Sequence, residues 1–401
     1  MEVRAGCKQT EVGVLPTDWC IHRLERISTQ IGDGLHGTPI YSQNEDYFFV
    51  NGNNLKNGKI VITSDTKSIG HFEFIKYKKS LSNRSILLSI NGTIGNLAIY
   101  DDEKIVLAKS AAFLNIRQDI CKSFIYYALQ SDIVKNQFLD GLTGSTICNL
   151  GLVTIRNTQI PTPSTTIEQE AIAEALCDAD ALIDSLEKLI EKKRQIKQGA
   201  MQELLTGKKR LPGFSGEWKE ISLAKVLKFQ VGFPFSSLFF NEDNQGLRLV
   251  KNRDLKNDGQ IFHYSGKHEE AFLVKNGDVL IGMDGDFIPC LWNKGTALLN
   301  QRVGRILPIH NLNLRFAYYF LIDPLKEIES STSATTVKHL SHRDIEGITA
   351  PLPSIEEQTA IANILSDMDE ELDFLETKLT KARQLKQGMM QALLTGKIRL
   401  V

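Results

Sequence analysis

The segment QIKQGAMQELLTGKKRL occupies residues 195–211, and QLKQGMMQALLTGKIRL occupies residues 384–400. Thirteen of the 17 positions are identical, at a constant offset of 189 residues. An internal repeat decides the architecture before any other signal, because each copy is expected to form the same structural unit.

The similarity continues upstream of these segments. PTPSTTIEQEAIAEAL (161–176) matches PLPSIEEQTAIANIL (351–365), and residues 146–161 match residues 336–351 more loosely. Near the start of each half, LPTDW corresponds to LPGFSGEW, and FVNGNNLKNGKI corresponds to LVKNRDLKNDGQI. The chain therefore holds two copies of one plan, in which about 150 residues of mixed sequence precede about 40 residues of repeated sequence.

The repeated stretches predict long helices. In both copies the apolar residues recur at steps of 4, 3, 4, 3 and 4, which is the period of a coiled-coil seam. A helix that faces a single core shows a similar seam, but the long, narrow and nearly proline-free run favours a helix pair. The seams are Ile172, Leu176, Ala179, Ile183, Leu186 and Ile190, and Ile361, Leu365, Met368, Leu372, Leu375 and Leu379.

Glycine occurs at equivalent places in both helices. Gly207 and Gly396 stand where helices commonly stop. Gly199 and Gly388 lie inside the helices, where glycine costs about 1 kcal/mol relative to alanine. Two explanations stay open for this inner pair: another backbone approaches closely there, or the helix frays.

The 150-residue parts predict compact α+β globules. SILLSINGTIGNLAIY (85–100) and DVLIGMDGDFIPCLW (278–292) each contain a strand, a turn and a second strand, and short helical stretches follow. The predicted fold class is α+β, with globules at 1–165 and 210–354 and helices at 166–209 and 355–401. We expect the helices to form an antiparallel coiled-coil spacer of roughly 55 Å, with pseudo-twofold symmetry and a globule at each end.

Composition excludes several classes. No apolar run has the length of a membrane span, and the start does not read as a signal peptide. The six cysteines are scattered, which fits a reducing cytoplasm and argues against a disulfide frame or a structural zinc site. The net charge is −1, so any DNA-binding surface must be local or shared with a basic partner.

No motif carries catalysis. GDGLHG (32–37) matches GxGxxG, but Thr38-Pro39 follows it instead of the helix that a dinucleotide site needs. LLTGKK lacks the upstream glycine of a phosphate-binding loop, and no Asn-Pro-Pro-aromatic or Asp-Pro-Pro-aromatic run occurs. The eight histidines show no metal-ligand spacing. We therefore predict no catalytic residue, no metal ligand and no cofactor in this chain.

The repeated features resemble the specificity (S) subunit of type I restriction–modification enzymes. KQTEVGVLPTDW at the front, DGLHGTPIYS in the first globule, and PxPS, EQxxIAxxL and KQGxMQxLLTGKxRL in each half carry this resemblance over essentially the whole chain. It implies a noncatalytic subunit with two target-recognition domains that bind a bipartite double-stranded DNA target. It also implies docking of two methyltransferase (modification) subunits, which use S-adenosylmethionine, and of restriction/translocase subunits. The two globules differ strongly in their loops, which predicts an asymmetric target.

Polar loop residues are the candidate DNA contacts. The alternative for each is a solvated loop or a turn former, above all for Asn91-Gly92 and Asp284-Gly285. The candidates are His36, Thr38, Asn51, Asn53, Asn54, Lys56, Asn91, Thr93, Lys109 and Ser110 in the first globule, and Lys251, Asn252, Arg253, Asp254, Asp284, Asp286, Gln301, Arg302, Lys338 and His339 in the second.

Apolar positions left over on the helices are the candidate partner contacts. Burial against the chain's own globules is the alternative. These residues are Leu189, Ile196, Leu204, Leu205, Leu385, Met389, Met390, Leu393 and Leu394.

Two other functions are weighed against DNA recognition. A self-contained DNA nuclease or methyltransferase conflicts with the missing catalytic motifs. A coiled-coil protein scaffold without sequence-specific DNA binding does not explain two globules with loops rich in Asn, Lys and Arg.

Overall fold

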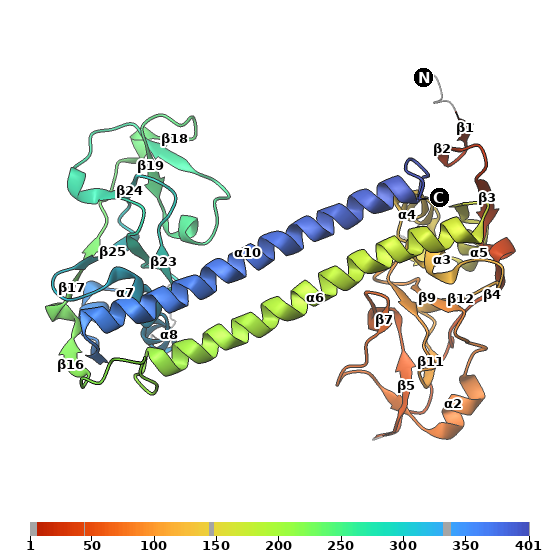
Figure 1. Cartoon of the computed structure of the whole chain (residues 1–401), viewed down its shortest axis with the longest axis horizontal. Coiled ribbons are helices and arrows are strands. Elements are labelled where there is room, and N and C mark those ends of the chain that lie inside the picture. The colour runs from red at the N-terminus through yellow and green to blue at the C-terminus, as the bar shows by residue number, and fades with distance from the viewer. Residues whose placement is uncertain (1–5, 44, 144–147, 332–337, 401) are drawn as a thin grey trace. The chain divides into compact units, whose positions relative to one another are not determined.

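The computed structural model describes residues 6–43, 45–143, 148–331 and 338–400 (Figure 1). The chain folds into two compact units, which we call unit 1 (Met1–Leu186 and Lys378–Val401) and unit 2 (Glu187–Thr377). The long helices α6 (Thr166–Leu204) and α10 (Ile355–Leu393) are shared between them. Each unit therefore contains one globule, the first half of the helix that follows it and the second half of the other helix, so the boundaries of the compact units fall inside the helices.

Unit 1 is built on a four-stranded antiparallel sheet, with strand order β10-β9-β12-β4, and a three-stranded sheet, with order β11-β5-β8. Strands β5 and β11 pair in parallel. The sheet strands are β4 (Ser28–Asp33), β5 (Tyr47–Val50), β8 (Ser68–Ile69), β9 (Ser85–Ser89), β10 (Leu97–Ile99), β11 (Ile105–Leu107) and β12 (Ala111–Ile116). The helices of this globule are α1 (Leu24–Ile27), α2 (His71–Tyr77), α3 (Lys122–Ala128), α4 (Asp132–Asp140) and α5 (Leu152–Asn157).

Strand β9, SILLS, explains how the two sheets share one globule. All five of its residues are buried, as expected for a strand covered on both faces. Since successive side chains point to opposite faces, Ile86 and Leu88 join the core that contains Phe124 of α3. Leu87 points the other way and joins Val50 of the smaller sheet in a second core.

Unit 2 repeats this plan. Its four-stranded sheet has order β17-β25-β22-β23, and a five-stranded sheet, β18-β20-β19-β24-β21, contains the parallel pair β19 and β24. Ile281 of β22 joins the helix-side core, and Leu280 joins a second core around Trp292. The strands are β17 (Leu227–Val231), β18 (Phe240–Asn241), β19 (Leu247–Val250), β20 (Phe262–Tyr264), β21 (Leu273–Val274), β22 (Val279–Gly282), β23 (Pro289–Leu291), β24 (Ala297–Leu299) and β25 (Val303–Pro308).

Short elements complete both globules and attach them to the helices. The helices of the second globule are α7 (Leu314–Phe320), α8 (Ile322–Ser331) and α9 (His342–Glu346). Strand pairs in unit 1 are β1 (Cys7–Thr10) with β2 (Gly13–Pro16), β3 (Cys20–Arg23) with β15 (Gln159–Thr162), β6 (Leu55–Lys56) with β7 (Lys59–Ile60), and β13 (Leu142–Thr143) with β14 (Asn149–Leu150). In unit 2, β16 (Lys219–Ser222) pairs with β26 (Thr349–Leu352). The predicted α+β class, with two globules that alternate with two long helices, is confirmed.

The predicted helix seams are confirmed. Nine of the twelve seam residues are buried, and Ala179, Met368 and Leu379 are half-buried. Within each unit the two helix segments run antiparallel. In unit 2, Arg194 pairs with Glu376 and Lys197 pairs with Asp369, so the partner's residue number falls as that of α6 rises. The predicted placement of the globules at the two ends of a spacer, and their pseudo-twofold relation, stay predictions.

One tyrosine ties each globule to its helix pair. Tyr127 of α3 donates a hydrogen bond to Asp180 of α6 (3.0 Å), and Lys386 of α10 lies 2.6 Å from the same carboxylate. In unit 2, Tyr319 of α7 donates to Asp369 of α10 (2.6 Å). Burial, together with the neighbouring carboxylate, raises the pKa of both phenols, so both tyrosines remain protonated donors.

The repeated terminal motif closes each unit. Gly207 and Gly396 have φ values of +70° and +67°, the left-handed conformation of a helix stop, and Lys209 N and Ile398 N bond back to the last helical turn. The arginine three residues after each glycine then bonds a buried glutamate in the first turn of the other helix. Arg210 bonds Glu357 through two nitrogens (2.6 and 2.7 Å), and Arg399 bonds both oxygens of Glu168.

Of the two explanations for the inner glycines, fraying is wrong, and the described chain itself supplies no closely approaching backbone. The helices continue past Gly199 and Gly388 to Leu204 and Leu393, so they do not fray there. An added Cβ at either glycine would meet no described atom within 4 Å, so no other part of the described chain approaches.

Gly199→Ala is therefore expected to raise the free energy of unfolding of unit 2 by about 1 kcal/mol, because alanine favours the helix and fills open space. Hydrogen exchange of unit 2 in the full chain under increasing urea checks this, with Gly388→Ala as the matched change in unit 1. A loss of stability in either variant would show that the helix surface is covered at that glycine.

No helix among the described residues is long and apolar enough to cross a membrane. The described residues also contain no group of three His, Cys, Asp or Glu side chains that could hold a metal ion.

Candidate nucleic-acid interface

Four loops of unit 1 meet at one edge of its sheets. They are the loops after β4, β5 and β9, and the loop between β11 and β12. Leu35 N donates to Leu107 O (2.7 Å), and Ile90 N donates to Ser110 O (2.9 Å). The Ser110 hydroxyl accepts a hydrogen bond from Gly52 N (3.0 Å). These bonds join the four loops into one connected set, which we call the loop frame. It contains nine of the ten candidates of the first globule, and the tenth, Lys56, lies in β6.

The polar side chains of these loops also bond to one another. Asn51 Oδ1 accepts from Asn53 N (2.9 Å), and Asn53 Oδ1 accepts from the Thr93 hydroxyl (3.0 Å). His36 Nε2 lies 2.6 Å from Asp33 Oδ2. The exposed candidates are His36, Thr38, Asn51, Asn53, Lys56, Thr93 and Lys109, whereas Asn91 and Ser110 are half-buried.

Asn54 is the exception, and its prediction as a DNA contact is wrong. The side chain is buried, and its amide accepts from Asn51 N (3.0 Å) and donates to Val61 O (2.9 Å) and Thr66 Oγ1 (3.0 Å). These bonds close the short 3₁₀ turn η1 (Gly52–Asn54). Asn54 therefore shapes the loop on which Asn51 and Asn53 are exposed.

The loops of unit 2 have the same frame. Met283 N donates to Arg302 O (3.0 Å), as Ile90 N does to Ser110 O in unit 1. An isolated antiparallel β-bridge joins the backbones of Asp284 and His339, and an equivalent β-bridge joins Asn91 and Asn149 in unit 1. The backbone equivalence pairs Asn91 with Asp284, Ser110 with Arg302, Lys109 with Gln301, Asn149 with His339, Asn51 with Lys251 and Asn53 with Arg253.

Lys251 and Arg253 lie against aromatic rings. Lys251 Nζ is 3.2 Å from the ring centre of Phe262 and 4.9 Å from that of Phe240, and the Arg253 guanidinium is 5.2 Å from Phe262. Burial lowers the pKa of Lys251, with the nearby Arg253 charge as a second cause. Such cation–π contacts hold both cations in place on the loop.

Asp254 is buried, and its prediction as a DNA contact is also wrong. It accepts from Lys251 N (2.8 Å) and caps the 3₁₀ turn η4 (Asn252–Leu255), the role that Asn54 has in unit 1. Burial raises the pKa of this carboxyl.

Four further candidates of unit 2 are Asn252, which lies in η4, and three loop residues. Asn252 Nδ2 donates to Asp284 O (2.6 Å), Asp286 pairs with Lys256, and Gln301 is exposed. Lys338 is half-buried.

Two glycines allow close contact between backbones in the loop frames. Gly34, after β4, lies against the β11–β12 loop, and Gly232, after β17, lies against the β24–β25 loop. An added Cβ at Gly34 would lie 2.2 Å from Leu107 O, and one at Gly232 would lie 2.1 Å from Asn300 O. Only glycine fits such an approach of two backbones.

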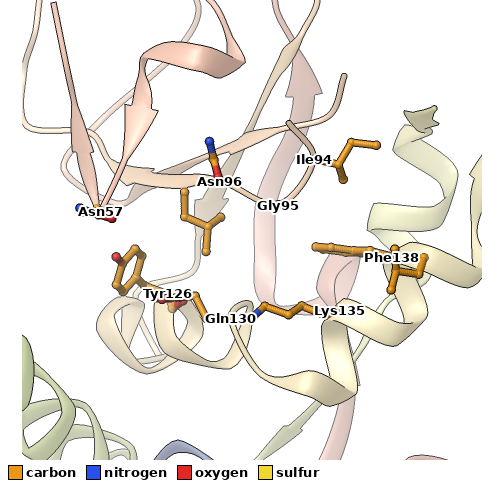
Figure 2. A pocket seen from close by; sticks show the side chains of 11 residues that line it. Asn57, Ile94, Gly95, Asn96, Tyr126, Gln130, Lys135 and Phe138 are labelled. Atoms are coloured by element: carbon orange, nitrogen blue, oxygen red, sulfur yellow. The ribbon is translucent and has the colours of Figure 1, made fainter. Parts of the chain in front are cut away.

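A cavity of about 410 Å³ lies beside this interface in unit 1. Figure 2 shows Tyr126, Gln130, Lys135 and Phe138 on one side of it and Asn57 on the other. The segment Ile94–Asn96, which follows the Asn91–Thr93 turn, also lines it. The described residues that line it supply amide, amine, phenol and apolar groups, and they do not include a pair of carboxylates or a nucleophile with a base.

Comparison with known proteins decides the family. The model for the type I restriction modification DNA specificity domain matches residues 36–198 and again residues 215–384. The chain belongs to this family. It is a type I specificity subunit, the component that recognises the DNA target, and both copies of its repeat are specificity domains.

Individual relatives agree with this assignment. The EcoBI specificity subunit of Escherichia coli is 36% identical over 186 residues, which are 45% of this chain and 39% of that subunit. The putative MjaX specificity subunit of Methanocaldococcus jannaschii is 27% identical over 98% of this chain and 96% of its own length. The crystal structure of an S subunit from M. genitalium shares the fold, with a TM-score of 0.63, 16% identity and 98% coverage of both chains.

Several helix residues predicted to bind partners are instead buried inside the specificity subunit. Leu204 belongs to the core of unit 2, and Leu393 and Leu394 belong to the core of unit 1, so their predictions as partner contacts are wrong. The globules cover the last helical turns, which sequence spacing does not show. Leu205, Met389 and Met390 pack partly against the same cores, and Leu189, Ile196 and Leu385 are exposed.

Asn149 is a candidate that loop composition alone did not single out in the specificity subunit. Its backbone bridge to Asn91 places it where His339 lies in unit 2. The repeat itself contains the signal, since His339 and Asn149 occupy matching places in the loosely matching segments before each helix.

Proposed function

We propose that this specificity subunit reads an asymmetric, bipartite DNA target, with one half-site for each unit. The observation that supports this most directly is the pairing of one loop frame with two sets of polar side chains. Where unit 1 has Asn91, Ser110 and Asn149, unit 2 has Asp284, Arg302 and His339.

Base pairs differ in the donors and acceptors that they expose in the major groove. Amides and hydroxyls, which predominate in unit 1, can donate and accept, whereas arginine only donates and carboxylates only accept. Two loop sets of different chemistry on one backbone frame therefore favour two different half-sites. The net charge of −1 implies that partners supply part of the contact with phosphates.

The helices are the proposed docking surface for two methyltransferase subunits, in the cytoplasm. Leu189, Ile196 and Leu385 remain exposed on them, and the open surface at Gly199 and Gly388 leaves room for a partner's backbone. In this assembly methyl transfer from S-adenosylmethionine takes place in the methyltransferase subunits, restriction/translocase subunits join the complex, and this chain contributes no catalytic residue.

Methylome sequencing tests the proposed function. Cells would express this chain with its cognate methyltransferase subunit, and control cells that subunit alone. A gapped, asymmetric motif with methyladenine on both strands, seen only with this chain, is the expected result.

Two other results would contradict it. Co-purification of the two proteins without a motif would favour a protein scaffold. DNA cleavage or methylation by the chain alone would show a self-contained enzyme.

A further inference from the structure

Three loops of unit 2 bring together an arginine, an aspartate and a histidine. Asp284 Oδ1 accepts hydrogen bonds from Arg302 Nη1 (3.2 Å) and from His339 Nδ1 (2.9 Å). The side chains of Arg302 and His339 are 57% and 50% exposed, whereas that of Asp284 is 25% exposed. The carboxylate thus lies beneath two exposed groups that it holds side by side.

The cluster is not needed to hold the loops together. Main-chain bonds already do this: Met283 N donates to Arg302 O (3.0 Å), Leu340 N to Met283 O (2.8 Å) and Gly285 N to Lys338 O (3.1 Å). A cluster that only braced the loops would repeat what the backbone achieves. The exposed groups of Arg302 and His339 are therefore available to bind a ligand.

The hydrogen-bond donors of Arg302 that have no partner within the described chain indicate which ligand it fits. Among the described residues, Arg302 uses its side chain only toward Asp284, through Nη1. Its Nε and Nη2 groups form the planar edge that matches O6 and N7 of guanine, the commonest specific arginine contact in the major groove. The adjacent carboxylate repels phosphate oxygens, so this arginine is better suited to a base edge than to the DNA backbone.

We propose that Arg302 reads a guanine in the half-site bound by unit 2, and that Asp284 is the positioning residue that orients the guanidinium. The inference rests on the proposed function, which it deepens by naming the base and its reader. The equivalent positions of unit 1, Ser110 and Asn91, provide no arginine, so the other half-site is read differently.

The test uses the complex of the full chain with its cognate methyltransferase subunit. The methylome of the unmodified complex supplies the target, and competition binding then measures all four base pairs at each specified position. Arg302→Ala is expected to lower the preference for guanine at one position by about 5- to 150-fold and to leave the other positions unchanged. Arg302→Lys, which keeps the charge but not the planar edge, is expected to lose preference at the same position.

Asp284 variants separate positioning from a structural role. Asp284→Ala is expected to lose part of the preference at that same position, and Asp284→Asn to lose less, since its amide oxygen still accepts. The double variant Arg302→Ala/Asp284→Ala should lose no more than Arg302→Ala alone. Arg315→Ala, a change of an exposed arginine on α7, is the matched control and should change no position.

Three results would overturn the inference. Equal weakening for every duplex with a shallower salt dependence would make Arg302 a phosphate contact. If both Arg302 variants kept the base-pair preferences of the unmodified complex, Arg302 would have no role in recognition. Absence of any motif with the unmodified complex would overturn the proposed function itself, and this inference with it.

Discussion

Gly34→Ala is expected to lower the free energy of unfolding of unit 1 by about 3 kcal/mol. The new Cβ would lie 2.2 Å from Leu107 O and 2.3 Å from Ala108 O, and these are backbone atoms that cannot rotate away. Either the loop after β4 must move off the β11–β12 loop, or the sheets must separate. Both outcomes displace His36 and Lys109 from the shared frame.

Gly37→Ala is the matched control in the same loop. An added Cβ there would meet no described atom within 4 Å, so the change should stay within about 0.5 kcal/mol. Hydrogen exchange followed by mass spectrometry measures the two units separately, which a single denaturation curve does not. Protection lost in unit 1 and kept in unit 2 is expected for Gly34→Ala, and equal protection in both glycine variants would refute the argument.

The equivalent glycine of unit 2 tests whether each unit reads its own half-site. Gly232→Ala places a Cβ 2.1 Å from Asn300 O and should destabilise unit 2 instead. In methylome experiments each variant should then damage recognition of a different half-site. Loss of the same half-site in both variants would contradict the assignment of one half-site to each unit.

Arg399→Ala is expected to lower the free energy of unfolding of unit 1 by about 2–3 kcal/mol. The variant leaves the Glu168 carboxylate, whose side chain is only 1% exposed, without its cation. Breaking a buried ion pair costs about 3–5 kcal/mol, and the 35% exposure of Arg399 reduces the effect. Hydrogen exchange of unit 1 under increasing urea measures the loss.

Controls for Arg399 separate charge from packing. Lys397→Ala removes an exposed cation two residues earlier and should have little effect. Adding Glu168→Gln to Arg399→Ala should recover part of the stability, because a buried amide costs less than an unpaired carboxylate. A double variant no more stable than Arg399→Ala would show that lost packing, not the unpaired charge, explains the effect.

The same arginine makes stability depend on acid pH. Its hydrogen bonds hold the pKa of Asp18 below the ordinary value of 3.8. A carboxyl group with a lower pKa in the folded state contributes its stability above the unfolded pKa and loses it as pH falls through the folded pKa. Below about pH 4 the unmodified chain should therefore lose stability more steeply than Arg399→Ala, and parallel curves would contradict this.

Local signals in the sequence were sufficient for the helices and for the doubled plan. The 4, 3, 4, 3, 4 spacing depends only on residues one turn apart, so Ile172 and Leu365 could be assigned to seams without knowledge of any partner. Gly207 and Gly396 likewise mark helix ends through their own backbone conformation. The family resemblance rests on the same repeated segments.

Burial and long-range pairing were decided by the tertiary structure. Asn53 and Asn54 are adjacent and look alike in sequence, yet one is exposed and the other caps the turn. Leu385 and Leu393 belong to one helix, but only Leu393 is covered by the globule. Arg399 pairs with Glu168, which lies 231 positions earlier in the sequence. The physical reason is that exposure and ion pairing depend on which distant elements pack together. The spacing of residues within one element does not determine that packing.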